Sequence, residues 1–300
     1  MPTQSNSDRL RELLKGSYFL IMPCCYDGLT AKLIQEAGFP LTFMSGFGVS
    51  AVRLGLPDTG LISYGEMVDQ LRNICSISHI PVIGDGDTGY GNAVNVKRTV
   101  HGYIQAGAAG IMIEDQKSSK RCGHTRGKDV VDQETALLRM RAVMEARDEA
   151  KSQGRDIVVV ARTDAREIHG LEEAIERANR FHGMGADIIF VEAPRDEAEM
   201  QRICSEVEGV KMANMVEHGI TPVLPPATLA SMGFKIGAYP LTLLSAATCA
   251  MKKALDALAQ GNSYDPLLDF KDLQKLVGFP QYNEALSRLE DPNIKRERRP

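Results

Sequence analysis

Residues 80–115, IPVIGDGDTGYGNAVNVKRTVHGYIQAGAAGIMIED, contain the pattern that decides the fold. Two short apolar runs, 80–85 and 110–115, are rich in Val, Ile and Met. Runs of this kind are typical of strands buried on both faces of a parallel sheet. Residues 93–106 between them have a helical pattern. A strand, a helix and a second strand in this order predict one β/α unit whose strands run parallel.

The same alternation continues along the chain in both directions. Short apolar runs predict strands at 18–23, 41–45, 157–163, 188–192, 210–215 and 234–238, and helical patterns fall at 29–37, 64–76, 133–151, 171–184 and 197–206. Eight such units without a change of composition predict an α/β protein of the (β/α)8, or TIM, barrel class. A doubly wound open sheet is the alternative, but the GxGxxG fingerprint is absent after the first run. We expect a single barrel domain over residues 1–300, with a C-terminal helical extension from about residue 260.

Composition and charge narrow the class of protein. Hydrophobic residues make up 43% of the 300-residue chain, enough for a large core, and the formal net charge is −4. An acidic balance offers no basic surface for nucleic acid. The six cysteines form no CxxC pair, which fits a reducing compartment. The sequence shows no signal-like apolar segment and no run of about 20 apolar residues. We therefore expect a cytoplasmic protein with no nucleic-acid or membrane partner.

Polar residues stand at the carboxyl end of nearly every predicted strand. These ends are Ser45 with Gly46, Asp85 with Asp87, Glu114, Arg162 with Asp164, Glu192, and Asn214. Active sites of α/β barrels lie at the carboxyl ends of the strands. A single acidic strand end would be an ordinary helix cap or solvated terminus. Six polar ends in register instead predict a polar basin above an apolar core, because such groups are costly to bury alone.

Asp85 and Asp87 are the plainest metal candidates in this basin. They are two positions apart in DGDTGYG, residues 85–91, and carboxylates are hard oxygen ligands that suit Mg²⁺ or Mn²⁺. Glu114, and Asp58 in the loop after the second strand, are candidates to hold the ion through water. The alternatives are a glycine-rich turn whose aspartates cap a helix and, for Asp58, a plain turn after Pro57.

A charged loop, KRCGHTRGK at 120–128, follows the fourth predicted strand. It places Cys122 among four Lys and Arg side chains and next to His124 in the motif. Nearby cations stabilise a thiolate, so the sequence predicts a lowered pKa for Cys122. The same cations are suited to hold a carboxylate substrate. A solvated basic turn with an incidental cysteine is the alternative.

The loop over residues 117–128 is also expected to move. Gly123 and Gly127 are candidate hinges, and Lys120, Arg121 and Arg126 would repel one another in a closed loop that held no anion. We therefore expect the loop to be open in the empty protein and to close over a bound dicarboxylate. A rigid loop packed against a neighbouring subunit is the alternative.

Six segments resemble motifs of the isocitrate lyase / phosphoenolpyruvate mutase superfamily. They are FMSG at 43–46, DGDTGYG at 85–91, EDQ at 114–116, KRCGH at 120–124, RTDA at 162–165 and NM at 214–215. The resemblance runs from about residue 10 to about residue 255, in register with the predicted strands. KRCGH is similar to the lyase branch, which includes methylisocitrate lyase, 2,3-dimethylmalate lyase, oxaloacetase and the petal-death protein. Relatives that act on phosphonates typically lack this cysteine motif.

The resemblance implies a Mg²⁺-dependent carbon–carbon lyase, a homotetramer whose C-terminal helix is exchanged between subunits. Its substrate would be a small 2-oxo or 2-hydroxy dicarboxylate. Cleaving a 2-alkylmalate between C2 and C3 gives a 2-oxo acid such as pyruvate and a carbanion that must be protonated. Cys122 would be the general acid for that protonation, and Arg162 would stabilise charge on the C2 oxygen. The sequence does not identify the base for the C2 hydroxyl.

The remaining candidates would hold the substrate. Lys120 and His124 complete the catalytic set, by positioning the second carboxylate and tuning Cys122. The expected substrate-binding residues are Phe43, Ser45, Gly46, Gly123, Glu192, Asn214, Pro240 and Thr242. Among them, Ser45 and the Gly46 amide are placed to hold the pyruvyl carboxylate.

The segment YPLTLLS at 239–245 bears on the choice of substrate. Methylisocitrate lyases carry an arginine a few residues past the corresponding Tyr-Pro pair, suited to a third carboxylate. This chain has no basic residue there before Lys252, and an unpaired buried carboxylate is costly. We therefore expect a dicarboxylate with a small alkyl group, such as 2,3-dimethylmalate. Oxaloacetate hydrolysis and methylisocitrate cleavage are the alternatives, with phosphonate chemistry and a non-catalytic metabolite-binding barrel as more remote ones.

Overall fold

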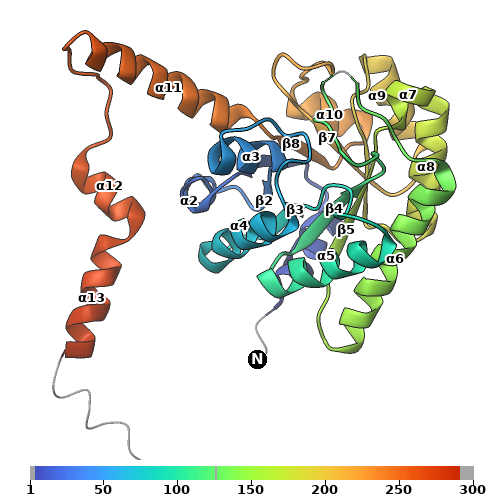
Figure 1. The fold of residues 1–300 in the computed structure, drawn as a ribbon, viewed down its shortest axis with the longest axis horizontal. Coiled ribbons are helices and arrows are strands. Elements are labelled where there is room, and N and C mark those ends of the chain that lie inside the picture. Colours follow the sequence, from blue (N-terminus) through green and yellow to red (C-terminus); the bar gives the residue numbers. More distant parts are fainter. Residues whose placement is uncertain (1–3, 126, 291–300) are drawn as a thin grey trace, which may run out of the picture. The chain divides into compact units, whose positions relative to one another are not determined.

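Eight parallel strands close into a barrel in the order β1 to β8 in the computed structural model, which describes residues 4–125 and 127–290 (Figure 1). Each strand pairs with the next along the chain, and Leu20 of β1 pairs with Ile236 of β8 to close the ring. The strands are β1 (Leu20–Cys25), β2 (Thr42–Met44), β3 (Val82–Asp85), β4 (Gly110–Glu114), β5 (Val158–Thr163), β6 (Ile188–Val191), β7 (Val210–Asn214) and β8 (Ile236–Tyr239).

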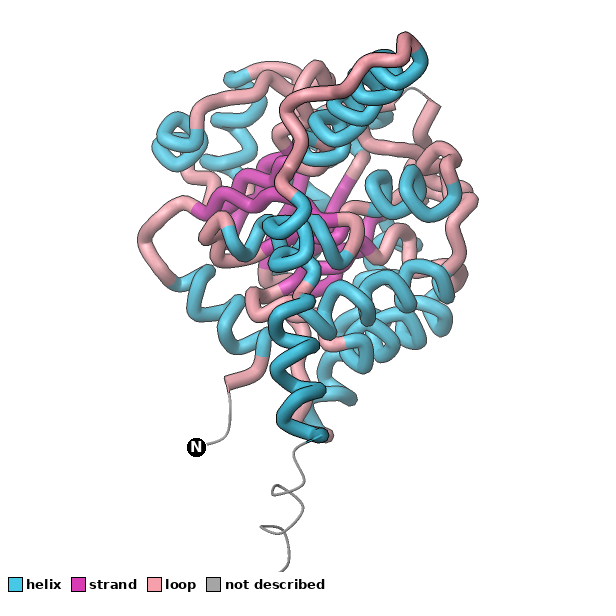
Figure 2. The backbone as a smooth tube through the Cα atoms, turned by 90° about the vertical axis from the view of Figure 1, so that its left-hand side faces the viewer, coloured by secondary structure: helices cyan, strands magenta, loops and turns pink. Residues whose placement is uncertain are grey.

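Helices within residues 1–245 surround this barrel, and the strands lie inside them in Figure 2. The helices of the whole described chain are α1 (Asn6–Lys15), α2 (Gly28–Glu36), α3 (Gly46–Leu54), α4 (Tyr64–Ile77), α5 (Ala93–Ala106), α6 (Gln133–Ser152), α7 (Ala165–His169), α8 (Leu171–Gly183), α9 (Glu197–Glu206), α10 (Pro226–Met232), α11 (Thr242–Ala259), α12 (Phe270–Val277) and α13 (Phe279–Glu290). All eight predicted strands are confirmed, so the (β/α)8 prediction is correct and the open sheet is not formed.

The core has two layers, separated by the sheet. On β5, Val158 and Val160 pack inside the barrel, whereas Val159 and Ala161 pack against the surrounding helices. Side chains alternate between the faces of a strand, so a strand buried on both faces is apolar throughout. Burying one such valine contributes on the order of 1.5–3 kcal/mol.

The same alternation carries polar side chains to the mouth of the barrel. The inward apolar layer includes Phe43, Ile83, Met112, Val160, Phe190 and Met212. Two positions further along the chain from each of these stand Ser45, Asp85, Glu114, Arg162, Glu192 and Asn214. Positions i and i+2 of a strand share a face. The polar basin predicted above the apolar core is therefore a consequence of strand register.

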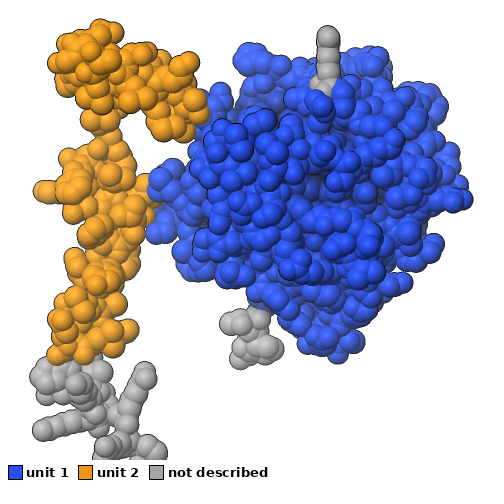
Figure 3. Space-filling view, in the orientation of Figure 1, with its two compact units in different colours: residues 1–245 blue, residues 246–300 orange. Residues whose placement is uncertain are grey.

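The chain divides into two compact units, residues 1–245 and 246–300 (Figure 3). The first unit contains the whole barrel. In the second, α12 and α13 expose large apolar side chains, among them Phe270, Phe279, Tyr282 and Leu289. The division falls inside α11, before the boundary expected near residue 260. A single barrel domain with a helical extension, and a helix exchanged between subunits, both stay predictions.

Helix length and composition also determine whether a helix could span a membrane. Across residues 4–125 and 127–290, no helix is both long enough and apolar enough to span a bilayer.

Candidate active site

A cavity opens at the carboxyl ends of the strands and encloses about 590 Å³ of empty space, counting its open mouth. This size suits a small organic molecule. Most of the predicted site residues line it: Phe43, Ser45, Asp58, Asp85, Lys120, Cys122, His124, Arg162, Asn214 and Pro240. Its floor is apolar, with Met112, Phe190 and Met212 from the inner barrel layer. The cavity is therefore a polar rim set on an apolar base.

One side of the cavity is a carboxylate cluster. Lys120 Nζ lies 2.7 Å from Asp58 Oδ1 and 2.6 Å from Asp87 Oδ1. Asp85 is next to them, since its carboxylate accepts hydrogen bonds from the backbone N–H groups of Gly46 and Asp87, each at 3.1 Å. Burial raises the pKa of the Asp85 and Asp87 carboxyls, and the Lys120 ammonium opposes that shift.

The turn that carries these carboxylates is not a simple helix cap. Asn92, and not an aspartate, caps α5 through its side chain. Asp87 and Tyr90 have φ of 49° and 58°, in the left-handed region that residues other than glycine rarely adopt. Tyr103 donates its hydroxyl hydrogen to Asp85 O. A strained backbone held by its surroundings is characteristic of functional sites, which disfavours the plain glycine-rich turn considered from the sequence.

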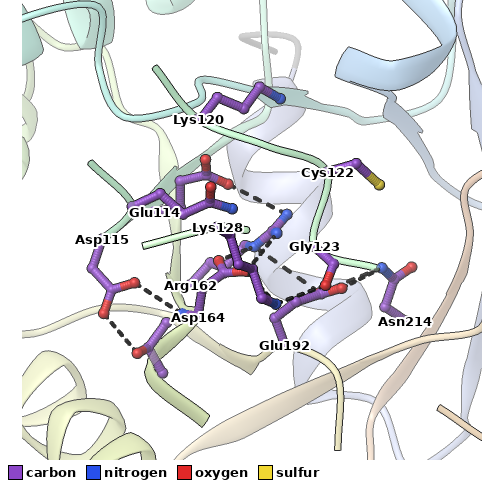
Figure 4. Close-up of polar contacts among 12 residues, drawn as sticks. Glu114, Asp115, Lys120, Cys122, Gly123, Lys128, Arg162, Asp164, Glu192 and Asn214 are labelled. Carbon is purple, nitrogen blue, oxygen red and sulfur yellow. Dashed lines mark hydrogen bonds and ion pairs between the residues drawn. The ribbon is translucent and has the colours of Figure 1, made fainter. Parts of the chain in front are cut away.

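A second group of charged side chains at the cavity is built around Arg162. Its guanidinium donates to both carboxylate oxygens of Asp164, at 2.8 and 3.0 Å, and lies 3.4 Å from Glu114 Oε2 (Figure 4). It also stands 5.4 Å from the centre of the Phe190 ring. Burial raises the pKa of Glu114 well above its ordinary value even though Arg162 opposes this. The sequence marks Asp164 only as a strand end, and its part in orienting Arg162 emerges from the structure.

His124 joins this side of the cavity to a second loop. Its Nδ1 accepts the backbone N–H of Ile220 at 3.0 Å, and its Nε2 lies 2.9 Å from Glu192 Oε1. Because Nδ1 accepts that N–H, the ring nitrogen that donates is Nε2, and it faces Glu192. Asn214 Nδ2 also donates to Glu192, at 3.3 Å. Burial opposes ionisation of Glu192, but Arg162 and His124 outweigh it and lower its pKa.

The sequence prediction for the Cys122 thiol is wrong in direction. Burial raises its pKa above the ordinary value of 9.0, and a hydrogen bond from the His124 backbone only partly offsets this. The nearby cations do not dominate because protein carboxylates already pair with them, Lys120 with Asp58 and Asp87. Cys122 is therefore protonated at neutral pH. A protonated thiol is the form that a general acid requires.

The same ion pairs remove the reason for expecting an open loop. Lys120 and Lys128 are buried and paired with carboxylates of the protein, so the closed loop does not crowd uncompensated charge. The loop lies over the cavity, and Arg121 and Cys122 line it. The Gln116 side chain holds the Arg121 backbone by two hydrogen bonds, at 2.8 and 2.9 Å. Arg126, the third cation of that expectation, is outside the described residues.

Ser45 and Gly46 stand where α3 begins. Ser45 is the N-cap, and its Oγ accepts the backbone N–H of Gly48. The Gly46 amide, expected to hold a substrate carboxylate, donates to Asp85 in this structure. A Cβ on Gly46 would lie 2.5 Å from Asp85 Oδ2, so glycine is required for this approach. The α3 N-terminus nevertheless directs backbone donors toward the cavity rim.

Not every predicted substrate-binding residue lines the cavity. Gly123 and Glu192 lie just behind its lining, where Glu192 is fully buried. Thr242 does not line it, because its hydroxyl donates to Glu217 and its side chain faces a separate apolar groove. Pro240 and Leu241, directly before Thr242, take its place.

Other residues of the lining were not predicted from the sequence as part of the site. They are Cys24, Phe47, Met112, Phe190, Met212, Val216, Ala238 and Leu241. The signal for several of them is present in the sequence, because they stand two positions before a polar strand end and must face the same way. Cys24 is a buried thiol that packs in the inner layer of the barrel and also forms part of the cavity lining.

The donor set fits a hard divalent cation. Asp58, Asp85, Asp87 and Glu114 supply carboxylate oxygens, and the buried Glu114 Oε1 has no hydrogen-bond partner among the described residues. Within that same part of the chain, no three His, Cys, Asp or Glu side chains converge to hold an ion unaided. Mg²⁺ does not require this, because it is usually bound by one or two carboxylates with water and substrate completing its shell.

Comparison with known proteins places these residues in a family. A family model described as phosphoenolpyruvate phosphomutase matches residues 10–259. The 2,3-dimethylmalate lyase of Eubacterium barkeri is 40% identical over 281 residues, or 92% of this chain and 96% of that protein. The chloroplastic carboxyvinyl-carboxyphosphonate phosphorylmutase of Arabidopsis thaliana is 41% identical, over 95% of this chain and 82% of that protein.

A solved structure extends the comparison to the fold. Oxaloacetate acetylhydrolase in complex with the inhibitor 3,3-difluorooxalacetate has a TM-score of 0.89 and 33% identity, and the match covers 94% of this chain and 96% of that one. These relatives carry three different activities in their names, so similarity alone does not select the reaction. It does fix the family: this chain belongs to the phosphoenolpyruvate phosphomutase family, within the isocitrate lyase / phosphoenolpyruvate mutase superfamily.

Proposed function

We propose that this protein is a Mg²⁺-dependent carbon–carbon lyase that cleaves a 2-alkylmalate-type dicarboxylate, such as 2,3-dimethylmalate, into a 2-oxo acid and a carboxylate. The observation that carries the proposal is the position of Cys122. Its protonated thiol lines the same cavity as Arg162 and Asp85. A thiol that keeps its proton until a carbanion forms is suited to protonate the departing carboxylate fragment.

The metal part of the proposal rests on the carboxylate cluster. Asp85 and Asp87, with Asp58 and Glu114 through water, would hold Mg²⁺ or Mn²⁺, which supplies Lewis-acid polarisation of the C2 oxygen. The other groups act from the chain itself. Arg162 is fixed by Asp164 and Phe190, so its charge is already oriented toward the cavity before substrate binds.

Substrate orientation would depend on the two ends of the cavity. Ser45 and the Gly46 amide, where α3 begins, would hold the pyruvyl carboxylate once a ligand displaces the contact between the Gly46 amide and Asp85. Arg121 lines the mouth, and none of the described residues forms an ion pair with its guanidinium, so it is suited to meet the second carboxylate. Pro240, Leu241 and Val216 offer an apolar wall for the alkyl group.

A dicarboxylate fits this lining better than a tricarboxylate. Lys120 and Arg162 are occupied by protein carboxylates, and residues 239–245 contribute Pro240 and Leu241 to the cavity instead of a cation. A third substrate carboxylate would therefore be buried without a partner, which is costly. Oxaloacetate hydrolysis is the second candidate, because a solved relative with a TM-score of 0.89 is an oxaloacetate acetylhydrolase.

Product analysis tests the proposal directly. Purified protein with Mg²⁺ is incubated separately with 2-alkylmalates, methylisocitrate, oxaloacetate and phosphonopyruvate. Release of a 2-oxo acid from a 2-alkylmalate supports the proposal, and release of oxalate and acetate from oxaloacetate supports the second candidate. Turnover of the phosphonate, retained in Cys122→Ala, would place the protein with phosphonate enzymes. No turnover of any compound would point to a non-catalytic binding barrel.

We also propose a homotetramer with an exchanged C-terminal helix. Support comes from the second compact unit, whose helices α12 and α13 expose Phe270, Phe279, Tyr282 and Leu289. Large exposed apolar side chains of this number favour burial against another surface. Light scattering coupled to size-exclusion chromatography tests it: truncation of the chain after residue 269 should lower the mass from that of a tetramer.

A further inference from the structure

Lys128 occupies a place in the molecule that the proposed mechanism does not use. Its side chain is fully buried at the base of the loop, and its ammonium has two hydrogen-bond acceptors and a second ion-pair partner. Nζ donates to Gly123 O at 2.6 Å and to Asp164 Oδ1 at 3.1 Å (Figure 4). It also lies 3.2 Å from Glu167 Oε2, with which it forms an ion pair.

The first of these contacts reaches the residue beside Cys122. Gly123 packs closely against two buried groups behind the cavity lining: a Cβ there would be 2.4 Å from Glu192 Oε1 and 2.5 Å from Arg162 Nη2. Only glycine permits this approach. The Cys122 carbonyl is tied in turn to Thr125, through N–H and Oγ1 at 2.9 and 2.7 Å. Contacts of both the Cys122 and the Gly123 carbonyls therefore hold the backbone on which the thiol stands.

The second contact ties Lys128 to the group that orients Arg162. Asp164 uses Oδ1 for both Lys128 and Arg162 Nη2, and Oδ2 for Arg162 Nε. Burial disfavours the charged ammonium, but Asp164 and Glu192 together outweigh this and raise the pKa of Lys128, so it stays charged. One carboxylate thus links the loop that carries the thiol to the strand that carries the guanidinium.

We propose that Lys128 is a positioning residue that locks Cys122 over the cavity, in register with Arg162, through the chain Gly123 O, Lys128 Nζ and Asp164. The kinetic part of this inference rests on the proposed function. The structural part does not, because it concerns the placement of the Cys122 thiol in the protein without substrate. Misplacing a reacting group by about 1 Å can lower a rate by about a hundredfold.

Lys128→Met is the informative change. Methionine has similar length and removes the donor, while Asp164 keeps both hydrogen bonds to Arg162. Lys117→Met is the matched control, since Lys117 is in the same loop but is half-exposed and pairs with the equally exposed Asp129. If Lys128→Met does not fold, Lys128→Gln replaces it, because the shorter neutral amide does not span from Gly123 O to Asp164.

The substrate-free readout is alkylation of Cys122 by iodoacetamide, followed by mass spectrometry. Trypsin releases Cys122 in the peptide 122–126, and Cys204 on α9, half-buried, serves as an internal reference. Releasing the loop exposes the thiol, so Cys122 should react at least about fivefold faster in Lys128→Met, with Cys204 unchanged. Lys117→Met should match the wild type at both sites.

The kinetic readout uses whichever substrate the panel identifies. Lys128→Met should lower kcat by about tenfold or more and leave KM within about threefold, because alignment and not affinity is lost. Unchanged Cys122 alkylation overturns the proposal, whatever happens to kcat. Parallel acceleration at Cys122 and Cys204 also overturns it, since that is general loosening of the fold. If no substrate is turned over, the proposed function fails, and alkylation alone decides the role of Lys128.

Discussion

Lys120 and Asp87 form a buried ion pair at the mouth of the barrel, with Nζ 2.6 Å from Oδ1 and neither side chain more than 5% exposed. The same ammonium lies 2.7 Å from Asp58. The loop at 120–128 therefore places the Lys120 ammonium within the carboxylate cluster. Asp85 remains without an ion-pair partner of its own among the described residues, and burial next to Asp87 raises its pKa. Buried negative charge of this kind is relieved by a divalent cation.

The first prediction concerns this cluster. Asp85→Asn should weaken Mn²⁺ binding, measured by electron paramagnetic resonance, by at least about tenfold, and should abolish turnover. Excess EDTA should abolish turnover of the wild type. Because the Asp85 pKa is raised, protons compete with the ion, and metal affinity should increase as pH rises above the ordinary carboxyl range. Asp69→Asn, on the exposed face of α4, is the control. Full activity in EDTA would contradict the metal assignment.

The second prediction separates an acid from a nucleophile. Cys122→Ser should lower kcat by about 10²- to 10⁴-fold, because a serine hydroxyl is a much weaker acid, while affinity for a substrate analogue changes little. Steady-state kinetics and calorimetry measure the two effects. Cys24→Ala is the matched control, since Cys24 lines the same cavity and should change kcat only a few-fold. A covalent adduct trapped on Cys122 would rule out the acid role.

The third prediction tests the protonation state of the Cys122 thiol. Burial raises the pKa of Cys122 above 9.0. Alkylation requires the thiolate, so its rate at Cys122 should rise about tenfold per pH unit and show no plateau up to pH 9. The measurement is the rate of iodoacetamide labelling of peptide 122–126 between pH 6 and 10. A plateau near pH 7 would restore the sequence-based expectation of a lowered pKa.

Strand register explains why so much of the site was predictable. Arg162 stands two positions after Val160, and Glu192 two after Phe190, so each polar side chain must face the barrel axis. That inference needs only the alternation of a strand and the known location of sites on this fold. Helix α3 is not evident from the sequence because its first turn, with Gly46 and Gly48, has low helix propensity, and its N-cap at Ser45 resembles a strand end.

The features of the site that were not predictable depend on which side chains, distant in sequence, pair with each other. The loop sequence shows the cations but not the carboxylates that neutralise them, and Asp58 and Lys120 are 62 positions apart. The prediction of a lowered pKa for Cys122 is wrong for this reason, because burial and the neighbouring ion pairs determine that pKa. Lys128 and Asp164, 36 positions apart, pair only once β4 and β5 lie side by side. Thr242 does not line the cavity because its hydroxyl turns to Glu217, which the sequence does not show.

The last prediction concerns Asp164. Burial opposes its ionisation, but Arg162 and Lys128 outweigh this and hold its pKa well below the ordinary value of 3.8. Asp164→Asn removes the shared carboxylate and leaves two buried cations without it. Breaking a buried pair in this way costs about 3–5 kcal/mol. We expect a loss of this size in the free energy of unfolding at pH 7, measured by guanidinium denaturation at fixed protein concentration.

The lowered pKa of Asp164 also determines how the loss of stability in Asp164→Asn should change with pH. A carboxyl whose folded pKa is depressed stabilises the fold fully above its unfolded pKa, and that contribution is lost as pH falls toward the folded value. The gap between wild type and Asp164→Asn should therefore be constant from pH 7 to about pH 5 and narrow below about pH 4. Asp129→Asn, which removes an exposed carboxylate of the same loop, should cause little change at any pH. A gap that stayed constant down to pH 2 would mean that the carboxylate charge is not what stabilises this part of the barrel.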